Sequence, residues 1–329
     1  MQSISQGIWD EITGKKLLLI ALSLVLLTHG IIIYFTLPKT YDAFVHLFFA
    51  DHYSRFWFEP WEYRWYTGFL TTSYPPLVHQ VIALIGKLFP LKVAFSIYAV
   101  FILECLTIGT YRFTKIFFSK SIAGVAAILT VLLSSIVETM HVYGQMPTLT
   151  GLAFLLNALP FLYQYILCKK SIHLLMALAF LAVTVSSHHV TAIFGMVFFI
   201  APTLFMALTD KVPVAQFGKN IISFILKIIQ TAWSHLKELI LFGSIMVFMT
   251  IGLIFPYWYW SKTDPITQVS IPHGSRDNFL LHPSSGLIFY IIPLILVISL
   301  LPAITFSLTR HKRYLGWAVA FFLCMLFGS

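Results

Sequence analysis

The densest group of side chains able to do chemistry lies early in the chain, in the stretch Tyr41-Asp-Ala-Phe-Val-His46-Leu-Phe-Phe-Ala-Asp51-His52. Asp42 and His46 are four residues apart, so they share one face of a helix. A carboxylate beside an imidazole at this spacing suits acid/base catalysis or the binding of one divalent ion. The alternative is a solvated amphipathic helix that carries the pair by chance, because a two-residue motif is weakly specific. Asp42 and His46 are the predicted catalytic residues.

Further carboxylate and imidazole groups stand where apolar segments end. Glu138 and His141 follow one apolar run, and His188 and His189 occupy the tight turn between two others. Ionisable groups near the depth of a bilayer are costly and mark functional sites. The alternative is that these residues are interfacial and contact water or lipid headgroups. Carboxylates combined with imidazoles suit Mg²⁺ or Mn²⁺. The predicted ligands of such a metal are Asp42, His46, Glu138, His141, His188 and His189.

A run of aromatic residues, Phe56-Trp-Phe-Glu-Pro-Trp-Glu-Tyr-Arg-Trp-Tyr66, follows the first group. The faces of Trp and Tyr stack on sugar rings, while Glu and Arg form hydrogen bonds with hydroxyl or phosphate groups. The alternative is an aromatic belt at a membrane interface, where Trp and Tyr are enriched. The two interpretations are compatible. Trp57 and Trp61 are the predicted aromatic residues of a substrate site.

These candidates must be positioned by a chain that is mostly apolar. Of its 329 residues, 59% are hydrophobic and only 10% are charged, whereas a soluble domain carries about 25% charged residues. The mean hydropathy is +0.87. This composition excludes a water-soluble globular protein, a disordered chain and a collagen-like fibre. The net charge of +9 points to membrane topology and not to nucleic acid.

A helix needs about 20 apolar residues to cross the hydrocarbon core. The first such run, 17–37, is predicted to be an uncleaved membrane anchor because no small-residue cleavage site ends it. We predict an all-α, polytopic transmembrane bundle of eight clear spans and a short ninth apolar run. They cover residues 17–37, 93–111, 122–137, 148–167, 172–186, 190–208, 239–257 and 287–304, followed by 316–327.

The distribution of basic residues decides the topology. Segment 75–89 is apolar but only 15 residues long, and it begins at a double proline. If it does not cross, 14 of the 21 Lys and Arg residues share one side; if it crosses, the later basic loops change sides relative to Lys15 and Lys16. Basic loops belong in the cytoplasm. The segment is therefore predicted to be an interfacial helix on the outer side, with the N-terminus in the cytoplasm.

A single integral membrane domain, 1–329, in the cell membrane follows from this topology. Its first outer loop is 38–92, and a second outer loop runs over 258–286. On the cytoplasmic side, segment 219–238 is amphipathic and is predicted to lie in the plane of the bilayer surface.

The order of these features resembles the C-type (GT-C) superfamily of membrane glycosyltransferases. The segments that carry the resemblance are Thr72-Ser-Tyr-Pro-Pro-Leu-Val78, His141-Val-Tyr-Gly-Gln-Met-Pro147 and Ser186-Ser-His-His-Val-Thr191. Within the superfamily, the chain is most similar to the bacterial and archaeal membrane proteins labelled "6-pyruvoyl-tetrahydropterin synthase-related". That label concerns a membrane domain and implies no pterin chemistry.

The resemblance implies two juxtamembrane helices in the first outer loop. It also implies transfer of a sugar from a polyprenyl-phosphate donor to an acceptor on the outer membrane face. Asp42 matches the first-loop carboxylate that activates the acceptor or binds a metal, with His46 beside it. Tyr74 and Gln145, from the resembling segments, are expected to bind substrate. From charge alone, Arg55 and Arg64 are expected to bind the lipid phosphate.

The chain departs from the superfamily in its length. Many members have eleven or more spans and an outer C-terminal domain, whereas this sequence ends at Ser329, close to an apolar run. It is expected to be a fragment or a reduced relative without an acceptor-binding domain.

Two other functions remain open. A transporter or flippase of a lipid-linked or polar solute places ionisable residues at mid-depth on broken helices, usually in related repeats. Here most acids lie at the outer boundary and no repeat is visible, which favours the enzyme. The third interpretation is a non-catalytic envelope assembly protein on the same fold.

Overall fold

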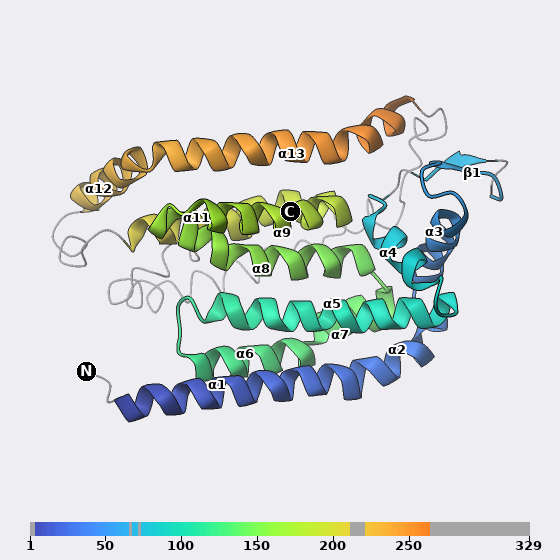
Figure 1. The fold of residues 1–329 in the computed structure, drawn as a ribbon, viewed down its shortest axis with the longest axis horizontal. Coiled ribbons are helices and arrows are strands. Elements are labelled where there is room, and N and C mark those ends of the chain that lie inside the picture. Colours follow the sequence, from blue (N-terminus) through green and yellow to red (C-terminus); the bar gives the residue numbers. More distant parts are fainter. Residues whose placement is uncertain (1–3, 66–67, 72–73, 211–220, 264–329) are drawn as a thin grey trace, which may run out of the picture.

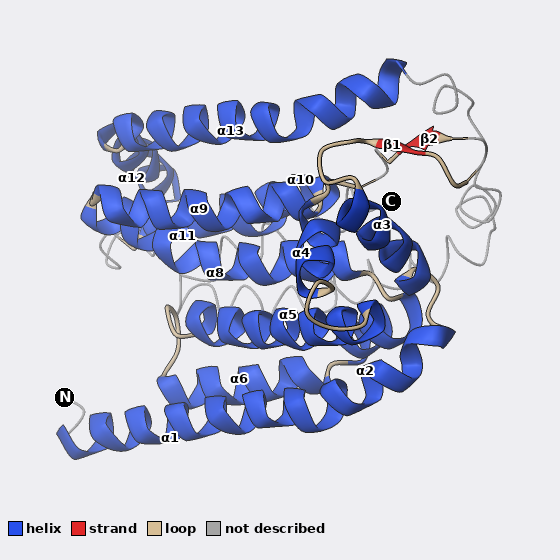
Figure 2. Ribbon diagram, turned by 45° about the vertical axis from the view of Figure 1, so that its right-hand side comes forward, coloured by secondary structure: helices blue, strands red, loops and turns tan. Residues whose placement is uncertain are grey.

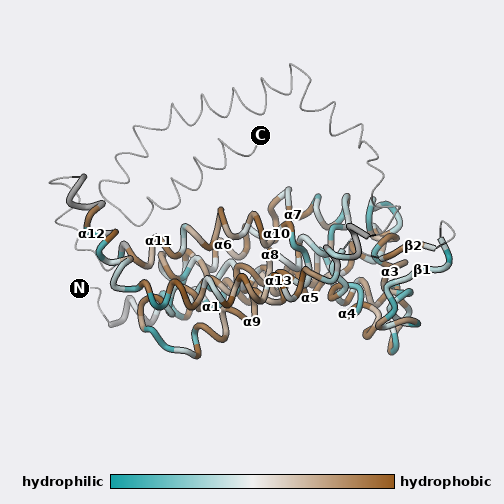
Figure 3. Tube along the Cα trace, turned by 90° about the horizontal axis from the view of Figure 1, so that it is seen from above, coloured by the Kyte–Doolittle hydropathy of each residue, from teal (hydrophilic) through white to brown (hydrophobic). Residues whose placement is uncertain are grey.

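The computed structural model describes residues 4–65, 68–71, 74–210 and 221–263. Over these residues the chain is an all-α bundle with one small antiparallel hairpin, formed by β1 (Trp61–Glu62) and β2 (Phe69–Leu70) (Figures 1 and 2). The long helices run roughly parallel to one another. Hydrophilic residues gather toward the two ends of the bundle, and hydrophobic residues occupy the length between them (Figure 3).

The first apolar stretch forms one long helical rod. It consists of α1 (Ile4–Leu24), the π-helical turn η1 (Val25–Gly30), α2 (Ile31–Thr36) and the 3₁₀ turn η2 (Leu37–Lys39). This rod packs beside α6 (Lys120–Leu132). Asp10 of α1 accepts hydrogen bonds from the backbone N–H groups of Lys120 and Ser121. A side chain of α1 therefore forms the hydrogen bonds that the free N–H groups at the start of α6 require.

The chain is bent between α6 and the helical segment that follows it, and a histidine forms a hydrogen bond with a backbone carbonyl beside this break. Leu133 is extended (φ −67°, ψ 123°) and separates α6 from α7 (Ser134–Glu138) and η3 (Thr139–Tyr143), which are bent by 43°. His29 Nε2 lies 2.9 Å from the carbonyl oxygen of Val131, in the last turn before the break. Since lipid offers no hydrogen bonds, an exposed backbone group there must find a protein partner.

The centre of the bundle is formed by α5 (Leu91–Thr114) and α8 (Met146–Cys168), which pack against each other. Half of the apolar stretch of α5 and 61% of that of α8 are buried in protein, against 11% in α13. Next come α9 (Ser171–Ser187) and a second helical rod. That rod consists of α10 (His189–Gly195), the π-helical turn η4 (Met196–Ile200) and α11 (Ala201–Thr209).

The last described helices are α12 (Ile221–Ser234) and α13 (Leu236–Thr263). The predicted amphipathic segment 219–238 is thus shorter than expected, because α12 ends at Ser234 and α13 begins two residues later. Residues 219 and 220 lie outside the described residues. Leu226, Ile229 and Trp233 expose 59%, 57% and 74% of their surface, as expected of a helix that lies on a bilayer.

Segment 38–92 leaves and rejoins the bundle at the same end (Figure 1). Besides the hairpin it contains two helices, α3 (Ala43–Arg55) and α4 (Leu77–Ile85), which pack against each other. With nine residues, α4 is too short to cross a membrane. Its apolar face is instead buried against α3 and α5.

Five described helical segments are long and apolar enough to cross a membrane: Trp9–Lys39, Leu91–Thr114, Met146–Cys168, His189–Leu208 and Leu236–Pro256. The bent pair made by α6 with α7 and η3 brings the number to six, and α9 is a shorter apolar helix. All seven predicted spans up to residue 257 fall on these helices. The predictions at 287–304, at 316–327 and for most of loop 258–286 lie outside the described residues, so the predicted total of eight or nine spans stays a prediction.

Cysteine labelling tests which end faces the cytoplasm. Cys168 is exposed and lies at the basic end of the bundle, while Leu88 is 81% exposed at the end that holds α3 and α4. In a chain without its other cysteines, an impermeant maleimide applied to intact cells is expected to label Leu88→Cys (with Cys168→Ser). Native Cys168 is expected to react only after permeabilisation. The reverse pattern contradicts the orientation, and labelling of both from one side contradicts the fold.

Candidate functional site

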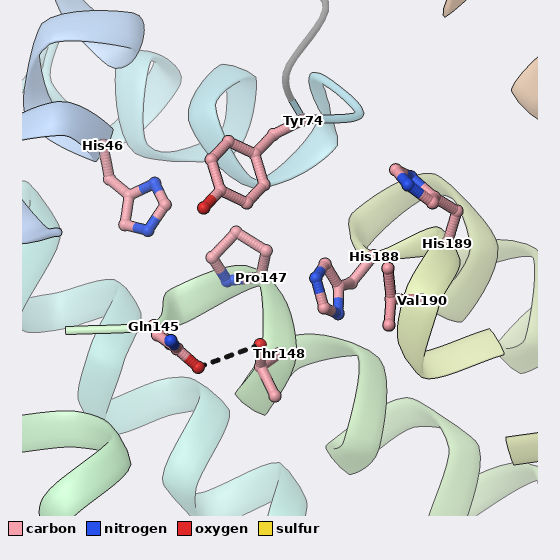
Figure 4. A pocket seen from close by; sticks show the side chains of 8 residues that line it. All are labelled: His46, Tyr74, Gln145, Pro147, Thr148, His188, His189 and Val190. Carbon is pink, nitrogen blue, oxygen red and sulfur yellow. Dashed lines mark hydrogen bonds between the residues drawn. The ribbon is translucent and has the colours of Figure 1, made fainter. Parts of the chain in front are cut away.

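A cavity of about 400 Å³ opens at the end of the bundle that holds α3 and α4. Its size lies within the range of small-molecule sites. Four of its lining side chains belong to histidine or tyrosine, and no Asp, Glu, Lys or Arg is among the described lining residues. Figure 4 shows the lining residues, which are His46, Tyr74, Gln145, Pro147, Thr148, His188, His189 and Val190.

Four separate parts of the chain meet at this cavity. His46 projects from α3, and Tyr74 precedes α4. Gln145 to Thr148 form the beginning of α8, and His188 to Val190 form the junction of α9 and α10. Each of the three segments that carry the family resemblance therefore contributes to one cavity, together with the predicted catalytic residue His46.

A close backbone approach holds α3 against the start of α8. The N–H groups of Tyr41 and Asp42 donate to the carbonyl oxygens of Val142 and Tyr143, at 3.0 and 2.9 Å. Gly144 then turns the chain into α8 with φ +69°, and a Cβ there would lie 3.0 Å from the backbone nitrogen of Ala43. Only glycine combines this conformation with this contact at little cost.

His46 is completely buried, and one of its two ring nitrogens has no hydrogen-bond partner among the described residues. Its Nδ1 lies 3.0 Å from Nε2 of His79, while its own Nε2 forms no hydrogen bond with any described residue. Burial, with a contribution from nearby His188, lowers the pKa of His46 to about 3, so the ring is neutral at physiological pH. If Nδ1–H donates to His79, the lone pair of Nε2 is left without a partner, and a general base requires such a free lone pair.

His188 faces His46 across Tyr74 and offers a donor. The backbone N–H of Thr191 points to Nδ1 of His188 at 3.4 Å, and the Thr191 hydroxyl lies 2.7 Å from the same atom. Because Nδ1 accepts from this N–H, the proton of the neutral ring sits on Nε2. Burial first, and then His189, lower the pKa of His188 to about 4. The Tyr74 ring lies 5.2 Å from that of His46 and 6.4 Å from that of His188.

Of the six predicted metal ligands, three line the cavity and the other three do not. His141 hydrogen-bonds to His29 (2.8 Å) and to Thr36 (2.9 Å), Glu138 is exposed at the end of α7, and Asp42 is not among the residues that line the cavity. Within the described ranges, no three His, Cys, Asp or Glu side chains are placed to hold a metal ion. This donor set does not fit Mg²⁺ or Mn²⁺, which take mainly oxygen ligands, and the metal stays a prediction.

The two arginines expected to bind phosphate are occupied by carboxylates outside the cavity. Arg64 pairs with Glu62 at 2.8 Å and with Asp51, and Arg55 pairs with Asp51 at 3.1 Å. Glu62 is 1% exposed and also accepts from Nδ1 of His52 at 2.9 Å. Hydrogen bonds from Arg64 lower the pKa of Glu62 to about 2. The charge pattern alone missed this network because it could not distinguish arginines bound by nearby acids from free ones.

The two tryptophans expected to bind substrate also lie outside the cavity lining. The carbonyl oxygen of Trp57 accepts from the amide of Gln80 at 3.2 Å, which links the aromatic run to α4. Trp61 begins β1, and its ring covers Gly68, whose Cβ position lies 2.6 Å from the indole and whose φ is +104°. These residues organise the hairpin.

Sequence reasoning missed the partner of His46. His79 is buried and lies in α4, 33 residues further along the chain, so no local spacing links the two residues. Pro147, Thr148 and Val190 of the cavity were also missed as single residues, although each lies within three positions of a predicted one. The nearest signal was the double proline before α4, which marks the start of a helix that carries His79.

No protein-family profile, no curated protein and no solved structure matches the chain significantly. The class of protein is therefore defined by the fold and the site. The chain is an all-α bundle with five described segments able to span a membrane and a histidine-lined cavity at one end.

The buried carboxylate network predicts a stability effect. Glu62→Gln removes the charge that pairs with Arg64 and His52, and is expected to lower the free energy of unfolding by about 3 kcal/mol. Because the pKa of Glu62 falls from 4.5 to about 2 on folding, its contribution is present above pH 4.5 and is lost as the pH falls toward 2. Thermal unfolding of the detergent-solubilised protein, followed by circular dichroism, measures both effects. The exposed Glu59→Gln is the control, expected to change stability by about 0.5 kcal/mol; equal effects of the two variants contradict the network.

Proposed function

We propose that this protein is a membrane glycosyltransferase. It moves a sugar from a polyprenyl-phosphate donor in the cell membrane to an acceptor on the outer face, and its N-terminus is cytoplasmic. The observation that carries the proposal is the convergence of the three resembling segments and His46 on one cavity. Lys15, Lys169 and Lys170 lie at the opposite end of the bundle, which the positive-inside rule assigns to the cytoplasm.

In this proposal His46 is the general base. Its Nε2 takes the proton of an acceptor hydroxyl while the acceptor oxygen bonds to the anomeric carbon of the sugar. The bond from that carbon to the phosphate oxygen breaks, and polyprenyl phosphate leaves. Burial keeps His46 in its neutral, proton-accepting form. The imidazolium that forms is costly in a buried site unless a negative charge is near, and the leaving phosphate supplies that charge.

The other lining residues suit a sugar. Tyr74 offers an aromatic face, and His188 offers an Nε2–H donor on the side opposite His46. Gln145 and Thr148 are joined by a 3.5 Å contact and bring amide and hydroxyl groups to the same wall. Neutral donors and acceptors around an aromatic ring recognise hydroxyl groups without a bound ion. Asp42, one turn before His46, is proposed to assist as the family carboxylate, and no step in the mechanism uses a metal.

One observation favours the transporter alternative, namely the bent pair of α6 with α7 and η3, since transporters use broken helices around their substrates. The break at Leu133 is not among the cavity lining, and His29 satisfies the Val131 carbonyl beside it. This arrangement explains the break as a packing feature, so the enzyme remains the preferred function.

Transfer of label tests the proposal. Membranes containing the protein are supplied with a pool of radiolabelled polyprenyl-phosphate sugars, and label is followed into material that lipid solvents do not extract. His46→Gln keeps a polar side chain but no comparable base, and is expected to lower transfer at least about 100-fold. Asp42→Asn is expected to lower transfer less, because the carboxylate is not among the lining residues.

Glu138→Gln is the matched control, because Glu138 is exposed and lies outside the cavity lining. Its transfer is expected to equal that of the wild type. If His46→Gln transfers sugar as fast as Glu138→Gln, the assignment of His46 is wrong. If purified protein in vesicles moves the labelled lipid across the bilayer without transferring its sugar, the transporter is the correct function.

A further inference from the structure

Inside the bundle, a partly buried arginine has no carboxylate partner among the residues that the structure describes. Arg112, in the last turn of α5, donates from Nη1 to the amide oxygen of Asn157 in α8, at 2.9 Å. Its guanidinium carbon lies 4.6 Å from the ring centre of Phe161 and 6.0 Å from that of Phe180 in α9. The positive charge therefore sits where three helices meet, among one amide and two aromatic rings.

The acids at this end of the bundle are engaged elsewhere. Each of the four has a named partner: Asp10 caps α6, Glu11 pairs with Lys15 and Lys120, Asp210 accepts from Tyr163, and Glu238 pairs with Lys169. Among the described residues, no ion pair to Arg112 is formed.

The rest of the chain offers little to neutralise Arg112. Glu104 of α5 is eight residues away, about 12 Å along the helix. Residues 278–329 and 211–220 contain no Asp or Glu at all. Only two acids, Asp264 and Asp277, fall outside the described residues. No acid that the structure describes is therefore left to neutralise Arg112, so an anion from outside the chain is a suitable counter-charge.

A partly buried charge without a counter-charge is unfavourable. Guanidinium pairs best with phosphate and carboxylate oxygens, through parallel N–H donors. At the basic end of a membrane bundle, the anion present at highest concentration is the phosphate of anionic lipids. We propose that Arg112 binds the phosphate group of an anionic membrane lipid between α5, α8 and α9. Phe161 and Phe180 flank the guanidinium with the apolar surface that lipid chains prefer.

The same chemistry would accept free phosphate, so the test separates the two sources. The full-length protein is reconstituted in phosphatidylcholine with or without phosphatidylglycerol, and retained lipids are counted by native mass spectrometry. The wild type is expected to retain phosphatidylglycerol in preference to phosphatidylcholine. Arg112→Gln is expected to weaken this binding about tenfold, as the loss of one charge-assisted hydrogen-bonded pair predicts.

Lys115→Gln is the control. It removes one charge three residues away, from an exposed side chain whose only described contact is with the ring of Tyr111, 5.7 Å from its centre. This variant is expected to bind phosphatidylglycerol as the wild type does. Equal losses in the two variants would show that only the general positive charge attracts the lipid, and would overturn the site.

Two further measurements keep the proposal falsifiable. If inorganic phosphate raises the melting temperature of the wild type as much as phosphatidylglycerol does, the ligand is a soluble anion and the lipid assignment is wrong. If Arg112→Gln does not fold, the wild type alone decides: a protein that retains no more phosphatidylglycerol than phosphatidylcholine overturns the proposal.

Discussion

The candidate site depends on the backbone pairing between the start of α3 and the end of η3. Two N–H groups, those of Tyr41 and Asp42, donate to carbonyl oxygens next to Gly144, where a side chain larger than hydrogen would collide with the start of α3. This contact joins the end of the first membrane rod to the beginning of α8. It brings His46 and Gln145 to one cavity although they are about one hundred residues apart.

Histidine side chains have several structural roles in this bundle. His29 satisfies a carbonyl group beside a broken helix, and His141 binds His29 in turn. His188 caps α10 while it presents its other nitrogen to the cavity. Neutral imidazole is suited to these roles because it carries one donor and one acceptor on opposite edges. It can therefore link two polar groups inside a low-dielectric bundle without burying a charge. Nε2 of His46, like Nε2 of His235, is a buried nitrogen with no partner among the described residues.

Much of the fold follows from the sequence, because a helix in lipid must satisfy its own backbone and must be about 20 residues long. The seven predicted spans up to residue 257 coincide with helices, and segment 75–89 contains a helix too short to cross. The boundary of the amphipathic segment was misjudged, because α12 ends at Ser234 and residues 236–238, which continue its amphipathic pattern, begin α13. The ion pairs of Arg55 and Arg64 were not predicted, because side-chain pairing depends on the tertiary fold around the hairpin, and phosphate binding by these residues stays a prediction.

The sequence by itself determined that this is a helical membrane protein with its basic residues concentrated at one end. Those properties depend on local apolar length and on the sum of charges, which need no tertiary contact. The sequence also identified five of the eight cavity residues, which are His46, Tyr74, Gln145, His188 and His189. Only the tertiary structure decided which candidates share a site. Asp42, Glu138 and His141 carry suitable groups, but contacts between distant segments such as His46 with His79 decide which side chains face the cavity, and such contacts leave no spacing signal along the chain.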